Sequence, residues 1–216
     1  MNTPAHPAKF SASVLDIVQA IVDEDNLSGR VIDPFAGVGR IGQLAGIQAV
    51  AVEIEADWAH QAPNSIVASA LTLPFRSRQF DGLVTSPCYG NRLADHHVAK
   101  DGSVRHSYTH TIGHDLHPDN AGTLQWGNAY RSFHAKAWHE VLRVLKPGAF
   151  VIVNVSNHIR AHQVQTVTEW HLSWFLARGC VLKRAEPVAT PRHREGANYK
   201  ARVDFETVFH LTAPTI

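Results

Sequence analysis

The sequence predicts an α/β fold with a doubly wound, mostly parallel sheet and helices on both faces. Short apolar runs typical of buried strands alternate with segments in which apolar residues recur at helical spacing. Strands that are separated by helices pair in parallel, and the crossover helices cover both faces of the sheet. With 216 residues, 44% of them hydrophobic, the chain can bury one substantial core. We therefore expect a single domain over residues 1–216.

The elements follow in order from an N-terminal helix to a C-terminal strand. Residues 11–24 place apolar residues such as Val14 and Val18 on one helical face, with a serine as the N-cap. The strands expected after this helix are 29–37, 47–55, 80–87, 147–156 and 206–212, and the helices are 40–45, 134–145 and 166–179. Residues 147–156 are largely apolar and β-branched, which suits a strand buried on both faces.

Composition excludes several classes of protein. The net charge of +1 gives no strong positive field, although 15 histidines can add charge beside phosphates. Two cysteines, Cys88 and Cys180, are too few for a disulfide framework or a Cys-rich zinc site. No signal-peptide core opens the chain, and no run reaches the roughly 18 apolar residues of a membrane span. We expect a cytoplasmic protein with no membrane partner.

The ends of the first two strands indicate a cofactor that contains a nucleoside. In doubly wound sheets, ligands bind outside the carboxyl ends of the strands. The first strand ends in DPFAGVGR, where Gly37 and Gly39 let the backbone turn sharply and approach a ligand. The second strand ends at Glu53, where a carboxylate can accept both hydroxyls of a ribose. These features are compatible with NAD and with S-adenosylmethionine, since each carries adenosine.

The third strand ends in TSPCYGNR, which favours recognition of a flat ring with an exocyclic amine. Pro87 cannot donate a ladder hydrogen bond, and its fixed backbone can hold carbonyl groups toward the cleft. Those carbonyls and the Ser86 hydroxyl would accept hydrogen bonds from an amine, and Tyr89 offers a stacking face for a flipped-out base. Cys88 offers a different chemistry, that of a thiolate nucleophile.

The order of DPFAGVGR and TSPCYGNR resembles motifs I and IV of the DNA methyltransferases that modify exocyclic amines with S-adenosylmethionine. HPAKFS resembles the motif that precedes motif I in one order of this family, and VEIEADW resembles motif II. LPFRSRQFD and LRVLKPGAFVIVN resemble segments on either side of motif IV, so the similarity covers most of the chain. The stretch from YGNRLADHH to LQWGNAYRSFHAKAW further resembles small methyltransferases of bacteriophage and prophage genomes.

The resemblance implies a class I Rossmann-like methyltransferase fold, with S-adenosylmethionine as cofactor and DNA as partner, RNA being an alternative. Position by position, the implied cofactor-binding residues are Lys9, Phe10, Asp33, Phe35, Gly37, Gly39, Glu53 and Ile54. The implied catalytic residues, which hold the target base, are Ser86, Pro87 and Tyr89. Serine at the head of the motif is commoner in enzymes that methylate cytosine N4, so cytosine N4 is the first expectation and adenine N6 the second.

The chain also departs from the family pattern at three positions. Arg40 stands where motif I usually has threonine, Ser69 where an acid is frequent, and Cys88 where the second proline is expected. Methylation at cytosine carbon 5 would use a cysteine thiolate, but it also needs an acid on the strand that here reads Val153-Asn154-Val155. We therefore interpret Cys88 as a small residue in a proline position. The modest net charge and the lack of a separate recognition domain leave open an enzyme of RNA or free nucleotides, and the three departures leave open a non-catalytic nucleic-acid binder.

Residues 91–128 form an irregular insertion, which we interpret as a candidate lid and target-recognition segment. Basic residues within it suit phosphate contacts. The predicted nucleic-acid contacts are Arg92, Lys100 and Arg105. His110 and His114 would share a helical face and raise the hypothesis of a zinc site, but no cysteine lies near them and no acid-rich surroundings are evident, so no metal is expected. A second basic segment, 189–202, could extend the nucleic-acid contact.

Overall fold

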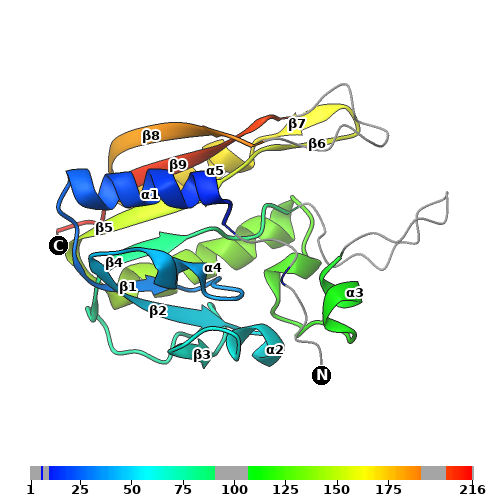
Figure 1. Ribbon diagram of the computed structural model, residues 1–216. Coiled ribbons are helices and arrows are strands. Elements are labelled where there is room, and N and C mark those ends of the chain that lie inside the picture. The colour runs from blue at the N-terminus through cyan, green and yellow to red at the C-terminus, as the bar shows by residue number, and fades with distance from the viewer. Residues whose placement is uncertain (1–5, 7–9, 91–106, 191–202, 216) are drawn as a thin grey trace.

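The computed structural model describes residue 6 and residues 10–90, 107–190 and 203–215. Seven strands form one sheet in the order β3-β2-β1-β4-β5-β9-β8 (Figure 1). They are β1 (Gly29–Asp33), β2 (Ile47–Glu53), β3 (Ser65–Val67), β4 (Phe80–Thr85), β5 (Leu145–Val155), β8 (Val181–Ala189) and β9 (Phe205–Thr212). The first five are parallel, and β9 runs antiparallel to both β5 and β8. The predicted doubly wound, mostly parallel sheet is confirmed.

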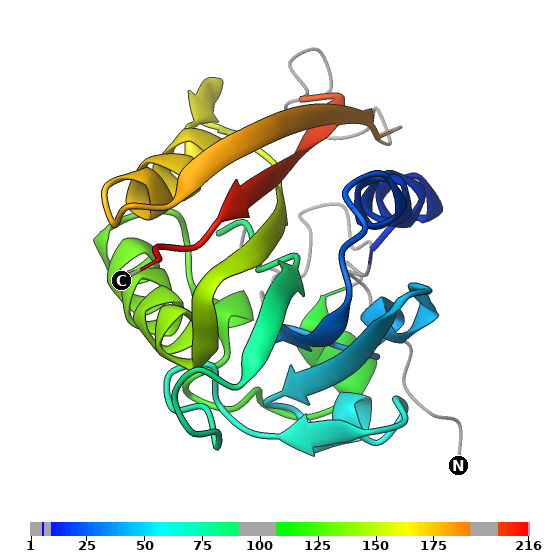
Figure 2. The ribbon, with the colours of Figure 1, turned by 90° about the vertical axis from the view of Figure 1, so that its left-hand side faces the viewer.

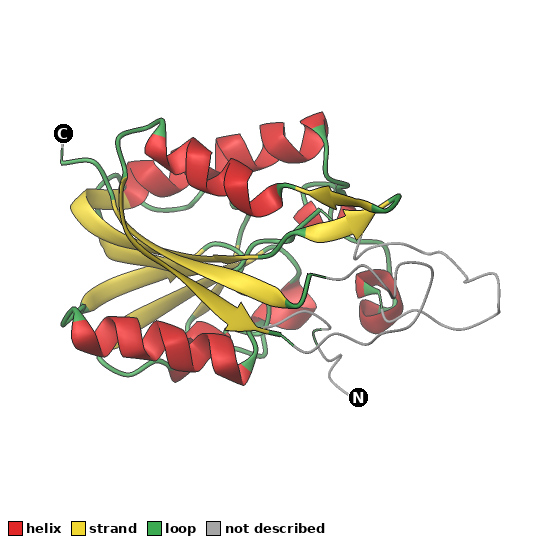
Figure 3. Ribbon diagram, turned by 90° about the horizontal axis from the view of Figure 1, so that it is seen from above, coloured by secondary structure: helices red, strands yellow, loops and turns green. Residues whose placement is uncertain are grey.

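Helices cover both faces of this sheet (Figure 3). Helix α1 packs in the core on one face, and α4 and α5 pack in the core on the other. The helices are α1 (Ala12–Glu24), α2 (Ala56–Ala59), α3 (Tyr108–Ile112), α4 (Asn128–Val144) and α5 (Val167–Leu176), with 3₁₀ turns η1 (Arg40–Gln43) and η2 (Ala121–Thr123). Ser11 caps α1, because its hydroxyl accepts from the Val14 N–H at 3.2 Å. Figure 2 shows the twist of the sheet between the helices.

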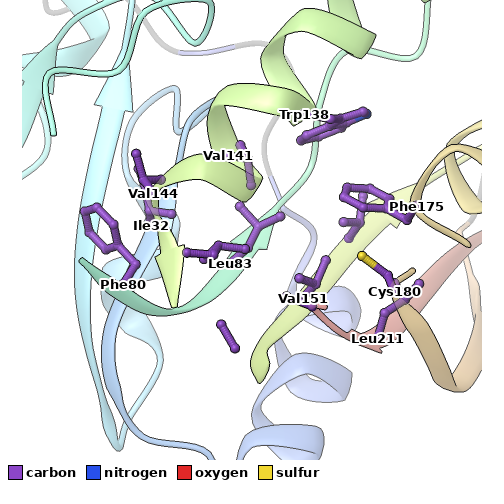
Figure 4. Packing of buried hydrophobic residues seen from close by; sticks show 14 of the residues in the cluster. Ile32, Phe80, Leu83, Trp138, Val141, Val144, Val151, Phe175, Cys180 and Leu211 are labelled. Carbon is purple, nitrogen blue, oxygen red and sulfur yellow. The ribbon is translucent and has the colours of Figure 1, made fainter. Parts of the chain in front are cut away.

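Successive residues of the central strands enter two different cores, which explains why these strands are apolar throughout. Ile32 and Leu83 pack with α4 and α5 against residues such as Trp138 (Figure 4). Their neighbours Val31 and Val84 pack with α1 on the opposite face. Side chains of a strand alternate between faces, so burial on both sides requires a continuous apolar run.

Several elements differ from the sequence prediction. The helix expected at 40–45 is only the short turn η1, and α4 begins at Asn128 instead of residue 134. The insertion 91–128 was predicted to be irregular, but its described part contains α3 and η2. Strand β8 was not predicted because most of its residues are exposed at the sheet edge and its apolar residues are interrupted by charged residues and a proline. The hairpin β6 (His158–Arg160) and β7 (Gln163–Gln165) is too short to give a pattern.

The strand order creates a crevice between β1 and β4. The chain moves outward from β1 to β2 and β3, and then returns to the other side of β1 to form β4. The loops that leave β1 and β4 therefore run in opposite directions from adjacent strands. Asp33 at the end of β1 and Thr85 at the end of β4 mark this switch point.

Candidate functional site

A cavity of about 380 Å³ opens at the switch point, within the size range of small-molecule sites. Loops and strand ends from widely separated parts of the sequence contribute to its wall. Of the residues predicted from the sequence, the wall contains Phe10, Phe35, Glu53, Ile54, Ser86, Pro87 and Tyr89. One cavity therefore brings together the predicted cofactor side and the predicted target side.

Asp33 joins the two strands beneath the cavity. Its Oδ1 accepts hydrogen bonds from the Phe35 N–H at 3.0 Å and from the Thr85 hydroxyl at 2.6 Å. Its Oδ2 is buried and has no partner among the described residues. Burial raises the pKa of the Asp33 carboxyl to about 7, and the nearby Glu53 acts in the same direction. Asp33 thus fixes the turn after β1 and keeps one acceptor atom unused.

Glu53 presents a carboxylate on the same side of the cavity. Its Oε2 accepts from the Gly37 N–H at 2.8 Å, and its Oε1 accepts from the Glu55 N–H at 2.9 Å. Each carboxylate oxygen can accept a further hydrogen bond. Burial raises the pKa of Glu53 to about 6. Gly37 has φ of +55°, a conformation that glycine adopts without steric cost, so the turn can direct its N–H to Glu53.

Gly39 is required for packing as well as for the turn. Its φ is +69°, and a Cβ at this position would lie 2.3 Å from the Cβ of Ala62. The glycine therefore lets the first turn after β1 lie directly against the segment after α2.

Three aromatic rings form a second part of the wall. The ring centroids of His6 and Trp58 are 4.3 Å apart, and Tyr108 lies 5.1 Å from each of them. Ile54 lines the cavity beside them. The Trp58 Nε1–H is buried and has no partner among the described residues. This wall combines flat apolar surfaces with one unused donor, which suits a heteroaromatic ring.

Glu55, which was not singled out from the sequence, ties the segment after α3 to β2. Its Oε1 accepts from the His117 N–H at 2.8 Å and from the Asn120 amide at 2.7 Å. The Asn120 Oδ1 in turn accepts from the Gly122 N–H at 2.8 Å, which caps η2. The signal in the sequence was the acid two residues after Glu53, which falls on the same side of the strand end.

The end of β4 carries a polar cluster that reaches two other strands. The Ser86 and Tyr89 hydroxyls lie 2.8 Å apart. Asn154, from β5, donates through Nδ2 to the Tyr89 Oη at 2.9 Å, and Glu206, from β9, accepts from the Tyr89 hydroxyl at 3.2 Å. Asn154 and Glu206 both line the cavity, and neither was predicted as a site residue. No local pattern reveals them, since their proximity depends on the pairing of β5 with β9.

Cys88 lies at the cavity wall and is half-buried. Its Sγ is 3.7 Å from the Tyr108 hydroxyl. Desolvation raises the pKa of the Cys88 thiol to about 12, so the thiol is neutral at physiological pH. The carbonyl of Cys88 accepts from the Tyr130 hydroxyl at 2.6 Å, which anchors the turn from behind.

Comparison with known proteins defines the fold. No protein-family model and no curated protein sequence matches the chain. The structure of an S-adenosylmethionine-dependent methyltransferase from Methanosarcina mazei matches it with a TM-score of 0.60 and 11% identity, covering 97% of this chain and 100% of that one. The fold is that of the Rossmann-like methyltransferases. It agrees with the fold class expected from the sequence.

Two further matches illustrate the range of this fold. A 1,6-didemethyltoxoflavin N1-methyltransferase from Burkholderia thailandensis, with bound S-adenosylhomocysteine, gives a TM-score of 0.53 and 14% identity over 94% of this chain and 79% of that one. The (4+2)-cyclase SpnF gives a TM-score of 0.59 and 14% identity over 97% of this chain and 85% of that one. A Rossmann-like methyltransferase fold therefore does not define the reaction, which must be argued from the site.

Some predicted residues cannot be placed in this fold. Lys9, Arg92, Lys100 and Arg105 lie outside the described residues, as does the side chain of His110. His114 is described, and its Nε2 lies 3.0 Å from Asp57 Oδ2. In the described part of the chain, no three His, Cys, Asp or Glu side chains gather as a metal site. No described helix has the length and apolar character to cross a membrane.

Proposed function

We propose that this protein transfers a methyl group from S-adenosylmethionine to the exocyclic amine of a base in DNA, with cytosine N4 as the first target. The observation that carries the proposal is the shared cavity, whose wall includes both Glu53 and the Ser86-Pro87 turn. A nucleoside-binding carboxylate and an amine-binding turn on one cavity suit transfer between two bound molecules.

The residues present fit the proposed cofactor. Glu53 would accept the ribose hydroxyls, and Ile54 with Trp58 would contact the adenine ring. Trp58 lines the cavity, and its Nε1–H is a buried donor without a partner among the described residues, which a polar cofactor can satisfy. When bound, S-adenosylmethionine supplies a methyl group already activated by the positive charge on its sulfur.

The protein's own contribution to the reaction is positioning. The backbone carbonyl of Pro87 would accept a hydrogen bond from one amine N–H of the base, and the polar cluster at Ser86 would accept one from the other N–H. These bonds draw the nitrogen lone pair out of conjugation with the ring and aim it along the cavity. Tyr89 would stack on the base, which must leave the duplex or come from a single strand to enter the cavity.

Methylation at cytosine carbon 5 is disfavoured by the state of Cys88. That reaction requires the sulfur to attack as a thiolate, whereas burial raises the pKa of this thiol to about 12. Adenine N6 is the alternative amine target within DNA. A smaller heteroaromatic amine is a second candidate class, favoured by the didemethyltoxoflavin methyltransferase match and by the net charge of only +1.

The decisive test is incubation of the protein with labelled S-adenosylmethionine and genomic DNA, followed by nucleoside analysis by mass spectrometry. We expect label in N4-methyldeoxycytidine. Label in N6-methyldeoxyadenosine would select the alternative amine, and label in 5-methyldeoxycytidine would contradict the role given to the Ser86-Pro87 turn. RNA and free nucleosides are tested in parallel, because transfer to them without transfer to DNA would contradict the DNA assignment.

A further inference from the structure

Asn154 is a buried amide at the target end of the cavity, and its partners are concentrated on one side. Its exposed fraction is only 1%, so the amide depends on the protein or a ligand for hydrogen bonds. The Nδ2 atom lies 2.6 Å from Glu206 Oε2, 2.9 Å from Tyr89 Oη and 3.2 Å from Ser86 Oγ. Because an amide nitrogen has two N–H groups, it can serve at most two of these oxygens at once.

Glu206 decides which way this amide faces. An asparagine side chain can exchange its nitrogen and oxygen by rotating its amide group, and its hydrogen-bond partners determine which orientation is adopted. The hydroxyls of Ser86 and Tyr89 can donate or accept, so they are compatible with either orientation. A carboxylate can only accept, and so Glu206 requires the nitrogen of Asn154 to face it.

The Asn154 Oδ1 is consequently directed away from Glu206, and it is buried with no partner among the described residues. A buried acceptor without a donor destabilises the free protein, and a ligand N–H removes that cost. Residues 152, 153 and 155 are apolar and enter the cores, so an apolar residue at position 154 would have left no such acceptor. Packing of the strand alone does not account for an amide here.

We propose that Asn154, oriented by Glu206, is a specificity-determining residue whose Oδ1 accepts a hydrogen bond from the substrate amine. The inference rests on the proposed function and deepens it by naming the chemical group that the site selects. The substrate class is a planar base with an exocyclic amine. A base that carries a carbonyl oxygen in place of the amine would set two acceptors against each other and be rejected.

The experiment measures discrimination between an amine and a carbonyl in the presence of S-adenosylhomocysteine, so it does not depend on methyl transfer. Calorimetry measures the affinity of the protein for each nucleoside separately. The affinity for deoxycytidine is compared with that for deoxyuridine, and the affinity for deoxyadenosine with that for deoxyinosine. We expect the wild-type protein to prefer the amine of at least one pair by about tenfold or more. In Glu206→Gln the Asn154 amide can face either way, so the preference should fall by about tenfold.

The amide and the carboxylate can also be exchanged between positions 154 and 206. Asn154→Asp alone places two carboxylates together, so one of them takes up a proton, and a protonated aspartate at position 154 is no longer a reliable acceptor; the preference should therefore be lost. In the double variant Asn154→Asp with Glu206→Gln, the glutamine can donate to one aspartate oxygen while the other oxygen remains an acceptor, so the preference should return. Glu186→Gln is the matched control, because Glu186 lies on the neighbouring strand β8 and is not part of the cavity wall. Affinity for S-adenosylhomocysteine reports folding in every variant.

The outcomes separate the inference from the proposed function. Wild-type methylation of DNA together with unchanged preference in Glu206→Gln overturns the inference and leaves the function. Loss of preference in both single variants with recovery in the double variant supports the inference, even if DNA is not the methylated substrate. A double variant that fails to recover, including one that fails to fold, overturns the exchange of roles on which the inference depends.

Discussion

Removal of one buried hydroxyl, that of Tyr130, should weaken both the fold and the reaction. Trp138 donates through Nε1 to His171 Nδ1 at 3.0 Å, so the neutral imidazole must carry its proton on Nε2. Burial holds the pKa of His171 well below its usual range, which keeps the ring neutral. His171 Nε2 then donates to the Tyr130 oxygen at 2.8 Å, and the Tyr130 hydroxyl donates to the Cys88 carbonyl at 2.6 Å. Each proton in this chain has one assigned acceptor.

Tyr130→Phe leaves two buried groups without a partner, the Cys88 carbonyl and the His171 Nε2–H. At about 1–3 kcal/mol for each buried group left unpaired, the free energy of unfolding should fall by about 3 kcal/mol. A change of tautomer at His171 would not restore the stability, because a proton on Nδ1 would leave the Trp138 Nε1–H without an acceptor. The turn that carries Pro87 would also lose its anchor, and small displacements of this kind reduce kcat by about tenfold to a hundredfold.

Urea unfolding and steady-state kinetics measure the two effects, and affinity for S-adenosylhomocysteine should remain within about twofold of wild type because Tyr130 does not line the cavity. Thr111→Val is the matched control. Its hydroxyl donates to the Ser107 carbonyl at 2.8 Å, but that carbonyl also accepts from the Thr111 N–H, so its loss should cost less than about 1 kcal/mol. If Tyr130→Phe and Thr111→Val were equally stable and equally active, the hydrogen-bond chain would have no role in holding the turn.

Three other predictions address the chemistry, the partner and the cofactor. Cys88→Ala should retain measurable methylation, and a covalent adduct of the wild-type protein on 5-fluorocytosine DNA would refute the positioning role of the turn. Replacing the three basic residues Arg92, Lys100 and Arg105 with alanine should weaken DNA binding and flatten its salt dependence without changing cofactor affinity. Unchanged DNA binding at all salt concentrations would exclude the segment that carries them from the DNA interface. Affinity for S-adenosylmethionine should increase as pH rises through the pKa values of Glu53 and Asp33, as calorimetry can measure.

Most of the sheet could be predicted from the sequence because its central strands are buried on both faces. Burial on both sides imposes a continuous apolar run, and the runs around Ile32, Leu83 and Ile152 are such signals. Strand β8 gives no comparable signal, because it lies at the edge of the sheet and only Val188 among its residues is buried. Edge strands with polar residues resemble exposed loops when only the order of residues is known.

Residues of the candidate site also differ in whether the sequence predicts them. The positions of Gly37 and Ser86 beside the cavity could be predicted, because each lies in the turn that directly follows its own strand, at the sheet edge where ligands bind in doubly wound folds. Glu206 could not be predicted, because it acquires a role only when β9 pairs with β5 and brings it to Asn154. Contacts between residues that are far apart in sequence depend on strand register, and the residues around each position do not reveal that register.

The pH dependence of cofactor affinity follows from two carboxyl groups that are costly to ionise in the free protein. Burial raises the pKa of Asp33 to about 7 and that of Glu53 to about 6, and the two charges disfavour each other. Raised carboxyl pKa values mean that the folded protein holds more protons than the unfolded chain between about pH 4 and about pH 7, so stability decreases as pH rises through this window. The positive sulfur of S-adenosylmethionine favours the ionised carboxylates, so affinity should rise from about pH 5 to about pH 8, by about tenfold for each unit by which binding lowers a pKa. S-adenosylhomocysteine lacks that positive charge and should show a smaller rise, and Asp33→Asn should remove the part of the rise near pH 7. Equal pH profiles for the two ligands would place these carboxyl groups outside the field of the cofactor.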